Sequence, residues 1–179
     1  MTQIAVNYAG ALYELSVQEE LSAAFLQQLQ VLRDAFDREP NFLRLLAAPN
    51  ISKEERCRVL DDSFRGRVHA YVLNFLKILT EKGYIRHFSD CLKVFENRYD
   101  EDNGILPVLA ETAVPLTQDQ SRRLQEKLQS ITGKTVVLTN RLDPACLGGV
   151  RLQYDGNQVD GTVQGRLEAM SNLLKNTVL

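Results

Sequence analysis

The feature that most constrains this chain is a helical spacing of apolar residues that continues up to Asn103-Gly104 and then stops. Apolar stripes with this spacing predict amphipathic helices, each with one face turned toward a shared core. The first stripe is Ile4, Tyr8, Leu12 and Leu15, and the second is Leu21, Phe25, Leu29, Leu32 and Phe36. The short connections between successive stripes favour a bundle.

Four more helices are predicted before Gly104. Pro40 suits the first turn of a short third helix, because its missing N–H is not needed there. Ser52-Lys53-Glu54-Glu55 is a capping box that begins a fourth. The fifth is expected from Arg67 to Lys82 and ends at Gly83, and the sixth carries apolar residues from Ile85 to Tyr99.

Beyond Gly104 the pattern predicts a small domain of mixed strands and helices. Strands are expected in Ile105–Val114, Thr135–Thr139 and Val150–Tyr154, and a hairpin turn at Asp155-Gly156-Asn157. Pro107 lacks an N–H, so its strand is predicted to be an edge strand or to begin there. One helix follows the capping box Thr117–Gln120, and a last one carries Val163, Leu167, Met170 and Leu174.

The predicted fold class is therefore α+β and mostly α. A six-helix N-terminal bundle occupies residues 1–104, and a small α/β domain occupies residues 105–179. The acidic segment Asp100-Glu101-Asp102 before Asn103-Gly104 is the expected boundary.

Charge and cysteine content exclude several functional classes. Residues 1–104 carry 13 Lys+Arg and 16 Asp+Glu, and residues 105–179 carry 8 and 7. Neither part has the basic excess that nucleic-acid binding requires. Three scattered cysteines favour a reducing, cytosolic compartment. No apolar run reaches the roughly 18 residues of a membrane span, and the N-terminus has no basic signal-peptide region.

Two glycine-containing stretches invite a nucleotide-binding interpretation, and neither supports it. Gly133-Lys134-Thr135 ends like a P-loop, but Leu128 stands where the first glycine is needed, and the segment leads from a helix to a strand. Residues 148–161 do not match the dinucleotide fingerprint. Their glycines fit a hairpin, and Asp160 or Thr162 is expected to cap the helix that follows. The alternative is a generic anion site, formed by free N–H groups of Asp160-Gly161-Thr162 at the helix start.

No catalytic or metal constellation is evident. His69 and His87 lie on different predicted helices without a ligand partner at metal-binding spacing, and no nucleophile–base pair is evident around the cysteines. We therefore predict no catalytic residue, no metal and no cofactor.

An apolar surface is the alternative to a chemical site. The fifth helix has one apolar face with Val68, Val72, Leu76 and Leu79, and a second with Tyr71, Phe75 and Ile78. Two faces indicate either a central helix or a helix whose second face accepts a partner helix. The stretch Tyr8-Ala9-Gly10-Ala11-Leu12 supplies small residues for a second wall of such a groove, or for tight packing within the bundle.

The motifs at the two ends of the chain resemble the delta subunit of bacterial F-type ATP synthases and its mitochondrial relative, the oligomycin-sensitivity-conferring protein. Tyr8-Ala9-Gly10-Ala11-Leu12 is similar to the family's Y-A-x-A-L. The C-terminal match comprises Gly148, Gly149, Asp160, Gly161, Thr162, Gly165, Arg166 and Leu167. Asn7, Thr162 and Gln164 depart from the usual residues, and the two losses of basic charge could alter a polar contact.

The resemblance implies a non-catalytic stator subunit that resists rotation of the catalytic head during proton-driven ATP synthesis. Its partners would be the N-terminal helix of an alpha subunit and the ends of b-type stalk subunits, at the cytoplasmic face of the bacterial plasma membrane. The alpha-subunit helix would contact the N-terminal bundle, and the stalk would contact the C-terminal domain. The residues expected to contact the alpha-subunit helix are Tyr8, Ala9, Ala11, Leu12, Val68, Tyr71, Val72, Phe75 and Leu79.

Two other functional classes stay open at this point. A cytosolic helical module that binds RNA or a transcription complex would need a basic face. An enzyme that uses residues 148–165 for a nucleotide would be stabilised by ATP.

Overall fold

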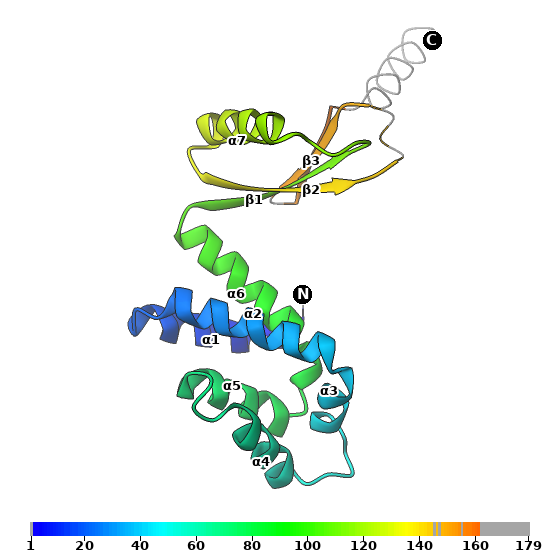
Figure 1. The fold of residues 1–179 in the computed structure, drawn as a ribbon. Helices are drawn as coiled ribbons and strands as arrows, with labels where there is room; N and C mark the ends of the chain where they lie inside the picture. The colour runs from blue at the N-terminus through cyan, green and yellow to red at the C-terminus, as the bar shows by residue number, and fades with distance from the viewer. Residues whose placement is uncertain (1, 145, 147, 155, 162–179) are drawn as a thin grey trace, which may run out of the picture. The chain divides into compact units, whose positions relative to one another are not determined.

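The computed structural model describes residues 2–144, 146, 148–154 and 156–161. The chain divides into two compact units, Met1–Tyr99 and Asp100–Leu179. The first is helical and the second contains a sheet with a helix (Figure 1). The predicted α+β class, with six helices before the sheet, is confirmed.

Six α-helices and one 3₁₀ turn lie before the sheet. They are α1 (Gln3–Gln18), α2 (Ser22–Arg38), α3 (Pro40–Leu46), α4 (Lys53–Phe64), α5 (Ala70–Glu81), η1 (Ile85–His87) and α6 (Phe88–Asp102). Both predicted signals for helix starts are present, since Pro40 opens α3 and Ser52 caps α4.

The capping box of α4 supports a first prediction. The Ser52 hydroxyl accepts from the Glu55 N–H at 3.1 Å, and the Glu55 carboxylate accepts from the Ser52 N–H at 3.3 Å. Ser52→Ala should lower the free energy of unfolding by about 1 kcal/mol in a urea titration, because the Glu55 N–H loses its acceptor. Ser52→Asp is the control and should stay close to wild type, since it restores an acceptor. An equal loss in both variants would argue against the cap.

The start of α5 differs from the prediction. The helix begins at Ala70 instead of Arg67, and His69 caps it by accepting from the Tyr71 N–H through Nδ1 at 3.3 Å. Gly66 has φ +77°, and an isolated bridge joins Arg65 to Val68, so the chain turns here before it becomes helical. Val68 therefore lies before the helix on which the sequence pattern had placed it.

Buried aromatic side chains form much of the core of the first unit. Phe36 of α2 is the centre of one group, with ring centroids 5.9 Å from Phe42, 6.2 Å from Phe64 and 5.1 Å from Phe88. Four separate helices thus meet at one side chain, which is 2% exposed. This packing explains why short connections between amphipathic helices suffice to build the unit.

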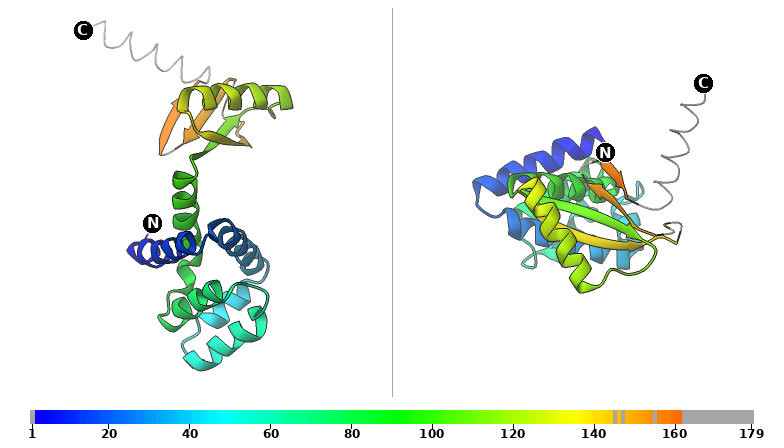
Figure 2. Two further views of the ribbon diagram at one scale, coloured as in Figure 1. Left: turned by 90° about the vertical axis from the view of Figure 1, so that its left-hand side faces the viewer. Right: turned by 90° about the horizontal axis from the view of Figure 1, so that it is seen from above.

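The second unit is a four-stranded mixed sheet with one helix. Its elements are β1 (Ile105–Thr112), α7 (Gln118–Thr132), β2 (Thr135–Leu142), β3 (Val150–Tyr154) and β4 (Asn157–Asp160), and the strand order is β2-β1-β3-β4. Strands β1 and β2 are parallel and joined through α7, whereas β3 pairs antiparallel with both β1 and β4. Figure 2 shows α7 along one face of this sheet.

The prediction that Pro107 marks an edge strand is wrong for β1 as a whole, because β1 lies inside the sheet. The reason is the length of its neighbours. Strand β2 pairs with all of Ile105–Thr112, whereas β3 pairs only with Leu109–Thr112. Among the described residues Pro107 thus pairs with a strand on one side only, a position where a residue without an N–H is tolerated.

The hairpin turn is confirmed by the pairing of Tyr154 with Asn157, and Thr117 and Gln120 form the predicted capping box of α7. Asp160 ends β4. The predicted last helix, including Val163 and Leu174, lies outside the described residues.

Candidate functional site: an apolar groove between α1 and α5

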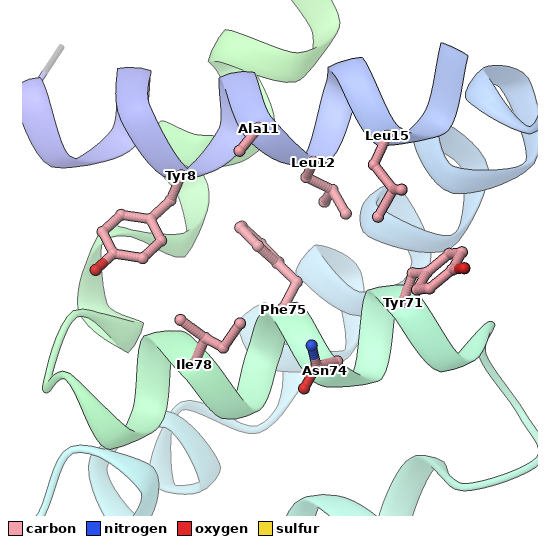
Figure 3. A pocket seen from close by; sticks show the side chains of 8 residues that line it. All are labelled: Tyr8, Ala11, Leu12, Leu15, Tyr71, Asn74, Phe75 and Ile78. Carbon is pink, nitrogen blue, oxygen red and sulfur yellow. The ribbon is translucent and has the colours of Figure 1, made fainter. Parts of the chain in front are cut away.

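The N-terminal unit carries a groove of about 310 Å³ between α1 and α5 (Figure 3). Tyr8, Ala11, Leu12 and Leu15 line it from α1, and Tyr71, Asn74, Phe75 and Ile78 line it from α5. Each set has the spacing i, i+3, i+4, i+7, which is one face of a helix. Asn74 is the only non-aromatic polar residue among the eight, so the groove suits an apolar occupant.

The two faces of α5 have different roles. Val72, Leu76 and Leu79 are completely buried in the core, which anchors the helix. Tyr71 is 38% exposed and Ile78 is half-buried, so the opposite face borders the groove. Lys77 lies off both faces, because its ammonium contacts Asp61 of α4 at 2.7 Å. The second apolar stripe of α5 is thus open at Tyr71 and Ile78, whereas Phe75 between them is 5% exposed and forms the floor of the groove.

The small residues of α1 also lie partly in the core and partly in the groove. Ala9 is 1% exposed and packs in the core, whereas Ala11 is exposed within the groove. A Cβ on Gly10 would lie 3.1 Å from the Arg98 guanidinium, which approaches α1 closely and contacts Glu14 at 3.2 Å. The Y-A-G-A-L stretch therefore combines close packing at Ala9 and Gly10 with an open position at Ala11.

Five of the nine predicted contact residues lie in the groove: Tyr8, Ala11, Leu12, Tyr71 and Phe75. The structure places Ala9, Val72 and Leu79 in the core, at 1%, 0% and 0% exposure, so they present no surface to a partner in this conformation. Val68 borders a different hollow, beside Asp61, Arg65 and Lys77.

The groove also contains Leu15, Asn74 and Ile78, which are absent from the predicted contacts. Leu15 and Ile78 already belong to the apolar stripes of the first and fifth helices, so taking each whole stripe as contact residues would have included them. Asn74 is polar, and the apolar pattern carries no signal for it.

One end of the groove is bordered by polar groups. The Tyr71 hydroxyl donates to the Glu19 carboxylate at 3.5 Å, just after α1 ends. At the other end the rings of Tyr8 and Tyr84 meet edge to face, with centroids 5.9 Å apart. A tyrosine at each end offers a large apolar surface together with a hydroxyl.

The C-terminal motif forms part of a hairpin in its described portion. Gly148 and Gly149 lead into β3, and Asp160 accepts from Arg151 Nε at 3.4 Å. A Cβ on Gly161 would lie 2.9 Å from the Val150 carbonyl oxygen, so this position needs glycine. Thr162, Gly165, Arg166 and Leu167 lie outside the described residues.

The histidines, the cysteine and the glycine considered above for catalysis, metal binding or nucleotide binding lie in helix caps, ion pairs, the core or turns. His69 caps α5, and His87 lies 3.7 Å from Asp90. Burial raises the pKa of the Cys91 thiol to about 11, the opposite of the shift that activates a thiolate nucleophile. Gly133 ends α7 with φ +68° and leads into β2, which is the reverse of the strand-to-helix order of a P-loop.

Within the described part of the chain, no three His, Cys, Asp or Glu side chains are grouped to hold a metal ion. The helices described there are also too short or too polar to cross a membrane.

Fold and groove together define a two-unit α+β protein with an open apolar helix face, and comparison with known proteins identifies its family. The profile of the ATP synthase delta (OSCP) subunit family matches residues 4–174. The ATP synthase subunit delta of Alkaliphilus oremlandii is 31% identical over 176 residues, which cover 98% of each chain. That of Desulfitobacterium hafniense (strain Y51) is 31% identical over 173 residues, 97% of each chain.

A solved structure supports the fold independently. A chain of the Toxoplasma gondii mitochondrial ATP synthase hexamer, determined by cryo-EM, aligns with a TM-score of 0.75 at 19% identity and covers 97% of this chain and 98% of that one. The chain belongs to the ATP synthase delta (OSCP) subunit family. It is a non-catalytic structural subunit, a stator component of an F-type ATP synthase.

Proposed function

We propose that the chain links the catalytic head to the membrane-anchored stalk at the cytoplasmic face of the bacterial plasma membrane. In this proposal the α1–α5 groove binds the N-terminal helix of an alpha subunit, and the C-terminal unit binds the ends of b-type stalk subunits. The chain would then resist rotation of the head during proton-driven ATP synthesis. Family membership favours this role over an RNA- or transcription-complex-binding module and over a nucleotide-using enzyme.

The observation that carries the proposal is the groove itself. Two helices present parallel apolar rows around an open hollow, which is the arrangement that accepts an amphipathic helix. Tyr71 and Tyr8 can anchor such a helix, because large aromatic side chains contribute most to tight interfaces. A stator contact must not dissociate when the head is pulled sideways. Dissociation of a helix from the groove would expose apolar surface to water again, at a free-energy cost of about 25 cal/mol per Å².

Exposed apolar residues of the second unit support a separate contact there. Val114, Ile131, Val137, Leu142 and Val159 are 48–71% exposed. A stalk subunit that covered these side chains would remove their apolar surface from water, which favours association.

A blocking substitution in the groove tests the alpha-subunit contact. The ligand is a synthetic peptide of roughly the first 25 residues of the alpha subunit from the same organism, about 37 Å long as a helix. Calorimetric titration of the full-length protein should give a Kd of about 1 μM or tighter. Ala11→Arg should weaken binding at least about 30-fold, because the new side chain occupies the groove and removes no buried contact.

The control places the same residue on a different helix. Val31 of α2 is 61% exposed and does not line the groove, so Val31→Arg should bind like wild type. Thermal melts should show that both variants fold. Wild-type affinity in Ala11→Arg would exclude the groove as the binding site. We chose Ala11 over Phe75, because Phe75 is 5% exposed and a charge there would also destabilise the bundle.

A further inference from the structure

The groove has an acidic end that its apolar lining does not require. Leu15 and Tyr71 lie at this end, and Tyr8 and Ile78 lie at the other (Figure 3). Glu19 and Glu20 follow α1 directly, and the Glu19 carboxylate accepts from the Tyr71 hydroxyl at 3.5 Å. The first Lys or Arg of the chain is Arg33, so α1 and the turn after it contain only acidic charges.

These two carboxylates lie where the fold disfavours them. A helix C-terminus carries partial negative charge, which disfavours nearby anions. The last turn of α1 has no basic residue to offset this. In the described part of the chain, neither Glu19 nor Glu20 forms a salt bridge.

The turn that holds these residues adds a second local conflict. The Leu21 N–H donates to the Ser16 carbonyl at 2.8 Å and the Glu20 N–H to the Val17 carbonyl at 3.1 Å, the two bonds of a Schellman motif. Its left-handed position, which usually holds glycine, is occupied by Glu20 at φ +57°. Local conflicts of this kind are expected where function, not stability, sets the residue.

A basic residue, Lys82, lies just beyond the opposite end of the groove, directly after Glu81, whose carboxylate accepts from the Cys57 thiol of α4 at 3.7 Å. Lys82 follows Ile78 by four residues, so helical geometry places it on the same face of α5, one turn further along. Lys82 is exposed, and at the end of α5 it also suits the helix dipole. The distance from Tyr71 to Ile78 corresponds to about 10 Å along the helix axis, or two turns of a bound helix.

We propose that the groove selects a helix by charge as well as by apolar fit. The occupant carries a lysine or arginine that contacts the Glu19–Glu20 end, and no basic residue at the Lys82 end. This inference rests on the proposed function, with the alpha-subunit N-terminal helix as the occupant, and it adds the end of the groove at which the basic residue of that helix lies. Paired charges at the rim of an interface guide the approach of the partner and fix its register more than they raise affinity.

The experiment removes the two charges without changing side-chain size. Full-length Glu19→Gln/Glu20→Gln is titrated with the alpha-subunit peptide at about 20 mM and about 300 mM salt, where screening differs strongly. At low salt the double variant should bind about three- to tenfold more weakly than wild type. Added salt should raise the wild-type Kd until it is close to that of the double variant. The Kd of the double variant should itself change little with salt.

Glu14→Gln is the matched control. This carboxylate is on α1, 70% exposed, and is paired with Arg98 away from the groove, so its removal should leave the Kd unchanged. If the Kd of the double variant is within twofold of the wild-type Kd at low salt while Ala11→Arg loses binding, charge selection is overturned. The groove would then still be the binding site. Absence of binding to the wild-type protein would instead overturn the proposed function and this inference together.

Discussion

Truncation of Phe36 to alanine is expected to lower the free energy of unfolding of the N-terminal unit by about 3–5 kcal/mol. Phe36 is 2% exposed, and its ring meets those of Phe42, Phe64 and Phe88 with centroid distances of 5.9, 6.2 and 5.1 Å. These neighbours come from three other helices, so they cannot all move into the cavity at once. Domains are stable by only about 5–15 kcal/mol, so much of the stability of the unit would be lost.

Denaturant titration combined with hydrogen exchange measures this effect. Protection should fall for the amides of residues 2–99, and the unfolding midpoint should shift without a large change in slope. Val31→Ala is the control, because Val31 lies on the same helix and is 61% exposed. Its cost should stay within about 0.5 kcal/mol. A cost below about 1 kcal/mol for Phe36→Ala would mean that the four helices do not depend on this contact.

Elements specified by local chemistry could be predicted from the sequence. The capping boxes at Ser52 and Thr117 fix helix starts through bonds that span only three residues. The hairpin turn at Asp155-Gly156-Asn157 is local in the same sense, and Tyr154 pairs with Asn157 as expected. Each of these features forms within one short segment, so predicting it does not require knowing how distant residues pack.

The division between core and groove could not be predicted in the same way. Ala9 and Ala11 are identical and two residues apart, yet one is buried and the other is exposed in the groove. Periodicity shows that α5 has two apolar faces, but not which face the other helices cover. That choice depends on the packing of α1 against α5, which involves residues more than fifty positions apart in the chain.

Buried charges were missed for a related reason. Arg56 is 7% exposed and donates to the Leu46 carbonyl at 2.9 Å and the Thr80 carbonyl at 3.4 Å. Both acceptors lie at helix C-termini, where free carbonyls and partial negative charge stabilise a cation. Backbone carbonyls are present at every residue, so no sequence pattern shows that these two face an arginine.

The second buried charge, Glu111, supports the prediction with the largest effect on the C-terminal unit. Glu111 lies on β1 and is 2% exposed. It pairs in register with Arg141 on β2 and Arg151 on β3, and its carboxylate contacts both guanidinium groups. Arg151 also reaches Asp143 at 3.7 Å and Asp160 at 3.4 Å. One carboxylate on β1 is therefore linked to both flanking strands, β2 and β3.

Glu111→Ala should destabilise this unit by about 3 kcal/mol. Removal of one member of a buried ion pair costs about 3–5 kcal/mol, and the lower end applies because Arg141 is 61% exposed and can turn to water. The sheet core is small, with Leu106, Val108 and Val136 as its buried members, so such a loss should unfold much of the unit. Glu111→Gln should cost less, because the amide oxygen still accepts from one arginine.

Hydrogen exchange and peptide binding together show which of the two units the Glu111→Ala substitution affects. In Glu111→Ala, protection should fall across residues 105–142, whereas residues 2–99 should keep theirs and the alpha-subunit peptide should bind with wild-type Kd. Glu126→Ala on the exposed side of α7 should change neither measurement. Loss of peptide binding in Glu111→Ala would show that the groove depends on the sheet. Retained binding would show that the groove does not depend on the sheet.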